Sequence, residues 1–193
     1  MFKGFRALAI AACLACAGFV TVSQVPAEAS AQDTDQITME FIGFGFNPDF
    51  YAIVQGSKLS GKSLVIYKVG GQGPTLVYPL THVSLEKALA SKEVSVYGIQ
   101  QNYVSGMVAP AGYQLGGMTI GENLQLTLSA GDQSMTLGYA PLFSSPNKSK
   151  IATVSIKSAY WTPDSKRVVI ILNQKLDGDW AVDTDMVAAF SLG

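Results

Sequence analysis

Cysteine and histidine are both scarce in this sequence. The 193 residues include two cysteines, Cys13 and Cys16, and one histidine, His82. Both cysteines lie in an N-terminal segment that has the features of a removable leader, so the rest of the chain has none. Without disulfides, a hydrophobic core must stabilise the protein. One histidine and no thiolate also leave too few ligands for a structural zinc site.

Clusters of one charge sign are lacking as well. Thirteen Lys and Arg against 14 Asp and Glu give a formal net charge of −1, and basic residues form no run. Nucleic-acid-binding proteins usually carry a clustered positive face, so we expect no nucleic-acid partner. Beyond the N-terminal segment, no apolar stretch reaches the roughly 20 residues of a membrane-spanning helix. We therefore expect no transmembrane segment after the leader.

The N-terminal segment is typical of a secretory signal peptide. Lys3 and Arg6 precede an apolar, uncharged stretch at residues 7–22, and two small-x-small cleavage sites follow at residues 27–29 and 29–31. This order of a basic, an apolar and a small-residue region directs export. We predict a signal peptide at residues 1–31 and an exported domain at residues 32–193, in the bacterial periplasm or outside the cell.

Two alternatives to cleavage near Ala31 stay open. The stretch from Ile10 to Cys13 resembles a bacterial lipobox, which would place a lipid anchor on Cys13. Only about six apolar residues separate Arg6 from Cys13, fewer than the roughly 7–15 of a usual apolar region. The other alternative is an uncleaved anchor, but the apolar run is short of the roughly 20 residues that spanning requires.

The rest of the chain predicts a mainly β, single antiparallel domain with one or two short helices. We expect strands at residues 37–46, 50–54, 64–69, 75–80, 93–99, 124–129, 135–139, 151–161, 168–172 and 180–190. A helix is expected at residues 84–91 with Ser84 as its N-cap, and a loop at residues 173–179. Short strands separated by Gly, Pro, Asn and Asp at near-regular spacing are typical of a sandwich, a barrel or part of a propeller.

Two similar segments, "FNPDFYAIV" at residues 46–54 and "YWTPDSKRVVIIL" at residues 160–172, each place a Pro-Asp turn before an apolar strand. The sequences "KLSG" and "KLDG" follow, and each precedes another apolar strand. The pattern resembles the hairpins of periplasmic β-propellers, where an "SPDG" turn joins two strands. Only two copies occur, about 115 residues apart, whereas propeller blades recur every 40 to 50 residues. We interpret the segments as two similar hairpins in one domain, with propeller blades as the alternative.

The same segments resemble a family of predicted secreted bacterial proteins of unknown function. The resemblance rests on "IGFGFNPDFYAIVQ" with "LVIYKV" near the start of the exported part, and on "VSIKSAYWTPDSKRVVIIL" near its end. It implies export and a β-rich single domain, and it implies no activity. The sequence departs from the pattern at Phe50, where the family has glycine, and in having no cysteine pair after residue 31.

Few residues suggest catalysis. His82 is the one histidine that a Ser-His-Asp device could use, and no G-x-S-x-G motif accompanies it. Ser84 to Lys87 matches the S-x-x-K motif of β-lactamases, but its companion motifs occur in the wrong order, and a helix N-cap explains Ser84. A hydrolase using carboxylates, with Asp164, Asp177 or Asp179, is an alternative function.

Four aspartates, Asp177, Asp179, Asp183 and Asp185, lie close together in the sequence. Calcium prefers several carboxylate oxygens on a flexible loop, so these residues are candidate ligands and calcium is a candidate cofactor. Their spacing does not fit an EF-hand loop. A solvated hairpin tip is the alternative interpretation.

Aromatic residues provide the other candidate site. Tyr160, Trp161 and Trp180 could form a binding surface, or they could fill the core of a sheet. The Gly-, Tyr- and Met-rich residues 103–121 could line a ligand site, because long loops often carry binding residues.

Since no nucleophile, base and metal set converges, we predict an exported, non-catalytic binding or envelope-associated module. Its partner would be a ligand or an envelope protein. A small-ligand carrier within a β-barrel is a further alternative.

Overall fold

The computed structural model of the chain describes residues 36–71, 73–145, 150–178 and 181–192, and these residues form a mainly β domain. All pairs of strands within them are antiparallel. The strands are β1 (Thr38–Phe44), β2 (Phe50–Ser57), β3 (Gly61–Lys68), β4 (Pro74–Pro79), β5 (Val104–Ser105), β6 (Gln114–Ile120), β7 (Asn123–Ala130), β8 (Gln133–Pro141), β9 (Thr153–Trp161), β10 (Arg167–Leu176) and β11 (Val182–Ser191), and the helices are α1 (Leu85–Leu89) and α2 (Lys92–Ser95). The predicted fold class is confirmed.

The strands form three open sheets, which we call A, B and C. Sheet A has the order β1-β2-β3-β4, sheet B has β11-β10-β9-β5, and sheet C has β6-β7-β8. A backbone hydrogen bond connects sheets A and B, because the Asp185 amide donates to the Ile37 carbonyl at 2.8 Å. None of the described strands closes a sheet into a barrel. The described residues therefore form neither the barrel that the sequence allowed nor a ligand cavity inside one.

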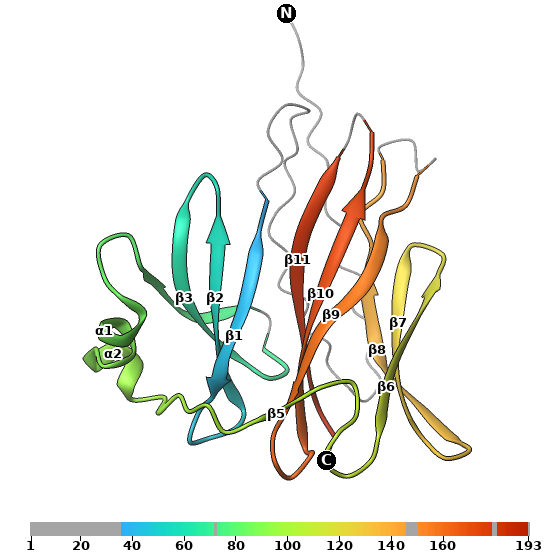
Figure 1. Cartoon of the computed structure of the whole chain (residues 1–193), viewed down its shortest axis with the longest axis horizontal. Helices are drawn as coiled ribbons and strands as arrows, with labels where there is room; N and C mark the ends of the chain where they lie inside the picture. The colour runs from blue at the N-terminus through green and yellow to red at the C-terminus, as the bar shows by residue number, and fades with distance from the viewer. Residues whose placement is uncertain (1–35, 72, 146–149, 179–180, 193) are drawn as a thin grey trace, which may run out of the picture.

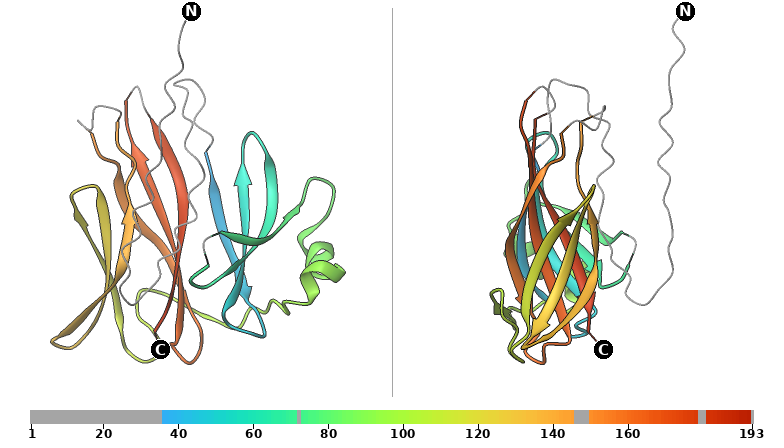
Figure 2. Two further views of the ribbon diagram at one scale, coloured as in Figure 1. Left: turned by 180° about the vertical axis from the view of Figure 1, so that it is seen from behind. Right: turned by 90° about the vertical axis from the view of Figure 1, so that its right-hand side faces the viewer.

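The sheets are stacked with sheet B in the middle. Successive residues of β10 alternate between two cores: Val168 and Ile170 pack with sheet C, and Val169 and Ile171 pack with sheet A. Figures 1 and 2 show this order, from α1 and α2 through sheets A and B to sheet C. A third core lies between sheet A and the two helices. Burial of both faces of sheet B explains why β10 and β11 have nearly continuous apolar runs.

The two Pro-Asp segments occupy equivalent places in two three-stranded meanders. One turn joins β1 to β2 and the other joins β9 to β10, and β3 and β11 then return along the second strand. In each meander the residue after the third strand donates a hydrogen bond to the residue before the second strand. These bonds run from the Val69 amide to the Asp49 carbonyl at 2.7 Å, and from the Leu192 amide to the Lys166 carbonyl at 2.8 Å. This arrangement agrees with the interpretation as two similar hairpins in one domain.

The prediction of a strand at residues 93–99 is wrong, because helix α2 occupies its first part. The Ser91 hydroxyl accepts the Val94 amide at 3.4 Å as an N-cap, and Gly98 adopts a positive φ of 55° after the helix. Capping at one end and a left-handed glycine at the other outweigh the alternation of Val94 and Val96. Val94 is buried beneath sheet A, whereas Val96 is exposed.

The prediction of a loop from residue 173 is also wrong, because β10 continues to Leu176. Gln174 pairs with Thr184 in the sheet and is completely buried. Its side chain accepts the Phe143 amide at 2.7 Å and donates to the Pro141 carbonyl at 2.8 Å. These partners lie more than 30 residues away in the sequence, so a polar residue here is compatible with a buried strand.

Candidate functional site

The outer face of sheet C has no charged residue. Leu124, Leu126 and Leu128 of β7 point inward to the core shared with sheet B, so the intervening residues point outward. The register of the strands identifies the twelve outward positions. They are Gln114, Gly116, Met118 and Ile120 of β6, Asn123, Gln125, Thr127 and Ser129 of β7, and Ser134, Thr136, Tyr139 and Pro141 of β8. We call this set the uncharged face.

Two tight turns hold the strands of the uncharged face in register. The β6–β7 and β7–β8 hairpins each have a two-residue loop that begins with glycine, Gly121 at φ 58° and Gly131 at φ 57°. Positive φ at this position suits the twist of a two-residue hairpin. The acidic residues of the region, Glu122 and Asp132, lie in these loops and not on the face.

Hydrogen bonds organise the centre of the face. The Gln125 amide nitrogen donates to the Thr136 hydroxyl at 2.8 Å and to the Tyr139 hydroxyl at 3.4 Å. These contacts cross from β7 to β8 and fix the side chain of the central strand. The face is therefore a preformed surface of amides, hydroxyls and one phenol ring.

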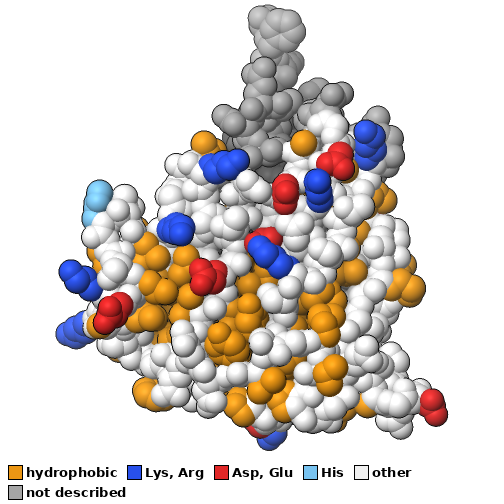
Figure 3. Space-filling model, in the orientation of Figure 1, with side chains coloured by type: hydrophobic (Ala, Val, Ile, Leu, Met, Phe, Trp, Pro, Cys, Tyr) orange, Lys and Arg blue, Asp and Glu red, His pale blue; other side chains and the backbone are white. Residues whose placement is uncertain are grey.

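Three large apolar side chains of the uncharged face are exposed to solvent. The exposed fractions are 59% for Met118, 45% for Ile120 and 51% for Tyr139. Figure 3 shows the surface over β6 and β7 as mostly uncharged, with an acidic side chain at its lower tip. Centres of protein interfaces are depleted of charge and enriched in Met and Tyr, so this composition suits a binding surface.

A polar hollow of about 270 Å³ lies where sheets A and B separate. Its lining includes two aspartates predicted from the sequence, Asp177 and Asp183, together with Lys58 and Lys175. Lys175 lies 3.7 Å from Asp177, and both side chains are largely exposed. The two lysines balance the carboxylates, so the hollow carries no strong field of one sign.

Asp185 does not line the hollow, and its side chain is buried in structural contacts. Its side chain is 3% exposed and forms a 2.6 Å ion pair with Lys157. The same carboxylate accepts the Met39 amide at 2.9 Å, which ties β1 to sheet B. The Asn173 amide bridges it to Asp183, with bonds of 3.1 and 3.0 Å.

The structure thus brings Asp183 and Asp185 together, but their carboxylates are bonded to the side-chain nitrogens of Asn173 and Lys157. Asp177 lines the hollow, and Asp179 lies outside the described residues. Among the residues that are described, no three His, Cys, Asp or Glu side chains are placed to hold a metal ion. Calcium binding by the full set of four aspartates stays a prediction, which a melting curve with and without calcium can test.

Two of the three aromatic candidates, Tyr160 and Trp161, pack against the hydrophobic cores on the two sides of sheet B. Tyr160 stacks on Phe41 at 4.4 Å between ring centroids, and Tyr103 packs against the edges of both rings. Trp161 has no exposed surface, and its indole nitrogen donates to the Gly106 carbonyl at 2.8 Å. Trp180 lies outside the described residues. Trp161 therefore fits the interpretation as a core residue, because a ligand at the surface could not contact it.

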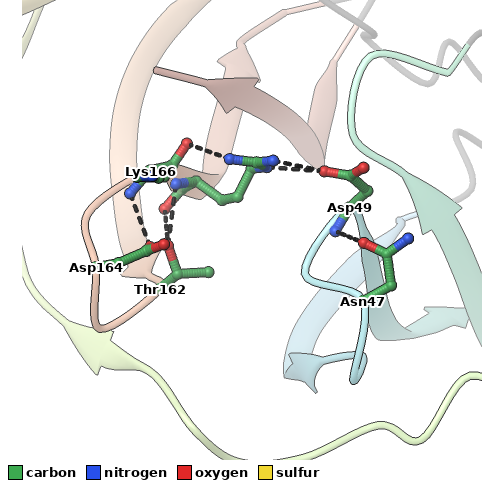
Figure 4. Close-up of polar contacts among 6 residues, drawn as sticks. Asn47, Asp49, Thr162, Asp164 and Lys166 are labelled. Carbon is green, nitrogen blue, oxygen red and sulfur yellow. Dashed lines mark hydrogen bonds and ion pairs between the residues drawn. The ribbon is translucent and has the colours of Figure 1, made fainter. Parts of the chain in front are cut away.

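The two Pro-Asp turns contact each other through Arg167. Its guanidinium binds one carboxylate oxygen of Asp49, from Nε at 2.9 Å and from Nη2 at 2.8 Å. Figure 4 shows the contact between the turn that carries Asn47 and the turn that carries Thr162 and Asp164. An ion pair between residues 118 positions apart in the sequence therefore joins sheets A and B.

Asp164 is committed to its own turn. Its carboxylate accepts the Thr162 hydroxyl at 2.6 Å and the Lys166 amide at 3.0 Å. The hydrogen bond from Thr162, followed by that from Lys166, lowers the pKa of Asp164. Asp164 precedes β10 and Asp177 follows it, so ten strand residues and roughly 30 Å separate them. These two candidates do not form a catalytic carboxylate pair, and Asp179 lies outside the described residues.

His82 and Ser84 lie beside α1. His82 is exposed, and the Ser84 hydroxyl accepts the Lys87 amide at 3.3 Å as the N-cap of the helix. The N-cap interpretation of the S-x-x-K motif is thereby confirmed. Of the helices within the described residues, neither has the length and hydrophobicity needed to cross a membrane.

Comparisons with known proteins add no relative. No family model, no curated protein and no solved structure matches this chain. The resemblance to secreted proteins of unknown function therefore stays a prediction.

Sequence reasoning missed the uncharged face. A usable signal was present, because only Glu122 and Asp132 are charged between Glu93 and Lys148. The Gly-, Tyr- and Met-rich composition of residues 103–121 indicates a long loop that could line a ligand site, whereas the structure places strand β6 in its last part.

Proposed function

We propose that this chain is an exported, non-catalytic binding module that associates with the cell envelope through the uncharged face. Export rests on the signal-like residues 1–31. Among the described residues, the catalytic candidates from the sequence lie far apart or form structural contacts. This arrangement supports a binding role. The partner would be an envelope component that offers hydrogen-bonding groups and apolar surface.

The observation that carries the proposal is the composition of the uncharged face. A solvated sheet face normally includes charged residues, which favour solubility. Twelve contiguous outward positions here include none, and Met118, Ile120 and Tyr139 stay exposed among amides and hydroxyls. A partner could cover these groups without the cost of removing a charge from water.

A charge placed on the face tests the binding surface. Tyr139→Lys introduces a cation at a position that is 51% exposed, and Val77→Lys on β4 is a matched control at 52% exposure. The assay is cosedimentation of the purified protein with isolated bacterial envelopes, separated into sacculi and membranes. We expect the wild type and Val77→Lys to sediment with one fraction, and Tyr139→Lys to lose at least nine tenths of that binding.

Equal sedimentation of all three proteins would place binding elsewhere and overturn the assignment to this face. Failure of the wild type to sediment with either fraction would overturn association with the envelope. Export has its own test, because mass spectrometry of protein from the periplasm and medium reads the mature N-terminus. Cleavage after Ala29 or Ala31 supports export by a signal peptide, an acylated Cys13 supports a lipoprotein, and cytosolic protein that begins at Met1 would overturn export.

A further inference from the structure

Strand β6 has an unusually open edge. It pairs with β7 on one side without any shift in register, and it contains no proline and no charged residue. The other five terminal strands of the described sheets differ. β1 has a register shift and carries Glu40, and β11 carries Asp183 and Asp185. β4 begins and ends with proline and has a bulge, β8 has a bulge and ends at Pro141, and β5 has two residues. Proline, bulges and shortness are devices that prevent pairing between edges.

The direction of the backbone groups of β6 follows from one hydrogen bond. The Leu115 amide donates to the Met107 carbonyl at 2.7 Å, on the side away from β7. Because backbone groups alternate along a strand, the amides and carbonyls of Gly117 and Thr119 point to the same side. In the part of the chain that the structure describes, no strand pairs with that side of residues 116–120.

We propose that β6 pairs antiparallel with β6 of a second copy of this chain, about a two-fold axis at Met118. Gly117 then lies opposite Thr119 of the second copy, and Thr119 lies opposite its Gly117. Each such pair exchanges two hydrogen bonds, so four backbone hydrogen bonds cross the axis. An axis at residue 117 would pair Thr119 with Leu115 of the second copy, whose amide already donates to Met107. An axis at residue 119 would pair Gly117 with residue 121, which lies in the turn. Both axes would therefore form fewer hydrogen bonds.

The side chains of β6 suit this register. On the uncharged face, Met118 would meet Met118 of the second copy across a closely spaced pair, where Cα atoms lie about 4.5 Å apart. Ile120 would lie over Gly116 of the second copy, which has no side chain to obstruct it. Both apolar side chains are exposed in the single chain and would contact the second copy on one side.

The lack of charge on β6 is compatible with pairing to a second copy. A charge close to the two-fold axis would lie near the same charge of the second copy and would oppose self-pairing. β6 has none, and Glu122 and Asp132 lie in loops at the ends of sheet C. Pairing would merge two copies of sheet C into one six-stranded sheet with a continuous uncharged face.

The interface is small. Five paired residues and two apolar side chains per copy bury less than the roughly 1,200 Å² of a stable, specific complex. We therefore expect a concentration-dependent dimer with a micromolar dissociation constant, measured by sedimentation equilibrium as a doubling of the weight-average mass.

A proline substitution separates pairing from folding. Thr119→Pro removes an amide that points away from β7, so it leaves the β6–β7 hydrogen bonds intact, and Thr119→Ala keeps the amide as a matched control. We expect the wild type and Thr119→Ala to dimerise, and Thr119→Pro to stay monomeric with an unchanged circular dichroism spectrum. A wild type that is monomeric up to millimolar concentration would overturn the proposal, as would a Thr119→Pro dimer of wild-type affinity.

Cysteine crosslinking tests the register without a proline. In a chain with Cys13 and Cys16 replaced by serine, Met118→Cys places two thiols at the axis, within the Cα separation of a disulfide. Ile120→Cys is the control, since its copies lie four residues apart along the strands, at roughly 13 Å. Fast oxidation of Met118→Cys alone supports the axis. Equal or absent crosslinking of both variants would refute it.

Dimer formation does not depend on the proposed envelope binding. Tyr139 lies on β8, two strands from the axis. Tyr139→Lys should therefore lose envelope binding and still dimerise, whereas Thr119→Pro should lose the dimer. Each proposal can fail without the other.

Discussion

Ser165 is the one described residue other than glycine that has a positive φ, at 58°. It follows Asp164 in the turn between β9 and β10, where the "SPDG" turns that this segment resembles have glycine. Its hydroxyl accepts the Ala111 amide at 2.9 Å, so the side chain ties the loop before β6 to the turn. Replacement of Ser165 should therefore have two opposing effects, which two variants can separate.

Ser165→Ala removes the hydrogen bond from the Ala111 amide. Alanine at this position would still have the free-energy cost of a left-handed backbone conformation. Loss of the acceptor leaves the partly buried Ala111 amide unpaired, which costs about 1–3 kcal/mol. Ser165→Gly loses the same bond and relieves a left-handed cost of about 1–2 kcal/mol. The greater entropy of glycine in the unfolded chain offsets about 0.5–1 kcal/mol of that gain. Ser165→Gly should therefore be more stable than Ser165→Ala by about 0.5–1 kcal/mol.

Thermal unfolding followed by circular dichroism measures this difference. In a domain of this size, 1 kcal/mol shifts the Tm by about 2–4 °C. We expect Ser165→Ala to melt lowest, with Ser165→Gly between it and the wild type or near the wild type. Equal Tm values for the two variants would show that the left-handed backbone cost at Ser165 does not exceed the entropy cost of glycine. A Ser165→Ala variant as stable as the wild type would refute the hydrogen bond to Ala111.

Three further substitutions test the core, a buried amide and the acid response. Leu126→Ala, in a side chain with no exposed surface, should cost about 2–5 kcal/mol in chemical unfolding, whereas its outward neighbour Thr127→Ala should change stability by less than about 0.5 kcal/mol. Gln174→Ala, which leaves a backbone amide and a carbonyl without their partner, should cost at least 2 kcal/mol; a smaller loss would refute the buried contacts. The bond from Thr162 lowers the pKa of Asp164 below its ordinary 3.8, so its stabilising effect is complete above about pH 4 and is lost as pH falls through the lowered pKa. Asp164→Asn should therefore be less stable at pH 7 and should lose less stability than the wild type in melts below pH 4; parallel pH curves would contradict this.

Local signals were sufficient for most of the fold. Proline at positions 48 and 163 fixes φ, and the adjacent Asp residues bond within their turns, so both hairpins could be located from the sequence. The apolar run from Val168 to Leu172 required a strand, and the structure places it between two other sheets. The strands around residues 131–132 were also predicted, because a glycine-led turn separates two alternating segments.

Contacts between distant residues explain what local signals missed. The polar residues around Gln174 predict a loop, and only its hydrogen bonds to Pro141 and Phe143 explain its burial in a strand. Val94 alternates with polar residues as in a strand, but the Ser91 cap and burial beneath sheet A select a helix. The candidate sites depended still more on tertiary structure, since Trp161 and Asp185 have the residue types of a binding site and are held in the interior.

The two faces of sheet C are subject to different constraints. Its inner residues must be apolar, because Leu124, Leu126 and Leu128 pack against sheet B and bury one of its faces. Its outer residues meet no other layer among the described residues, so folding alone would tolerate Lys or Glu there, and such residues would also oppose association. Stability of the sheet therefore does not account for the lack of charge across twelve outward positions. The proposed intermolecular contacts would account for both the uncharged face and the open edge of β6, because charge would be costly in each place.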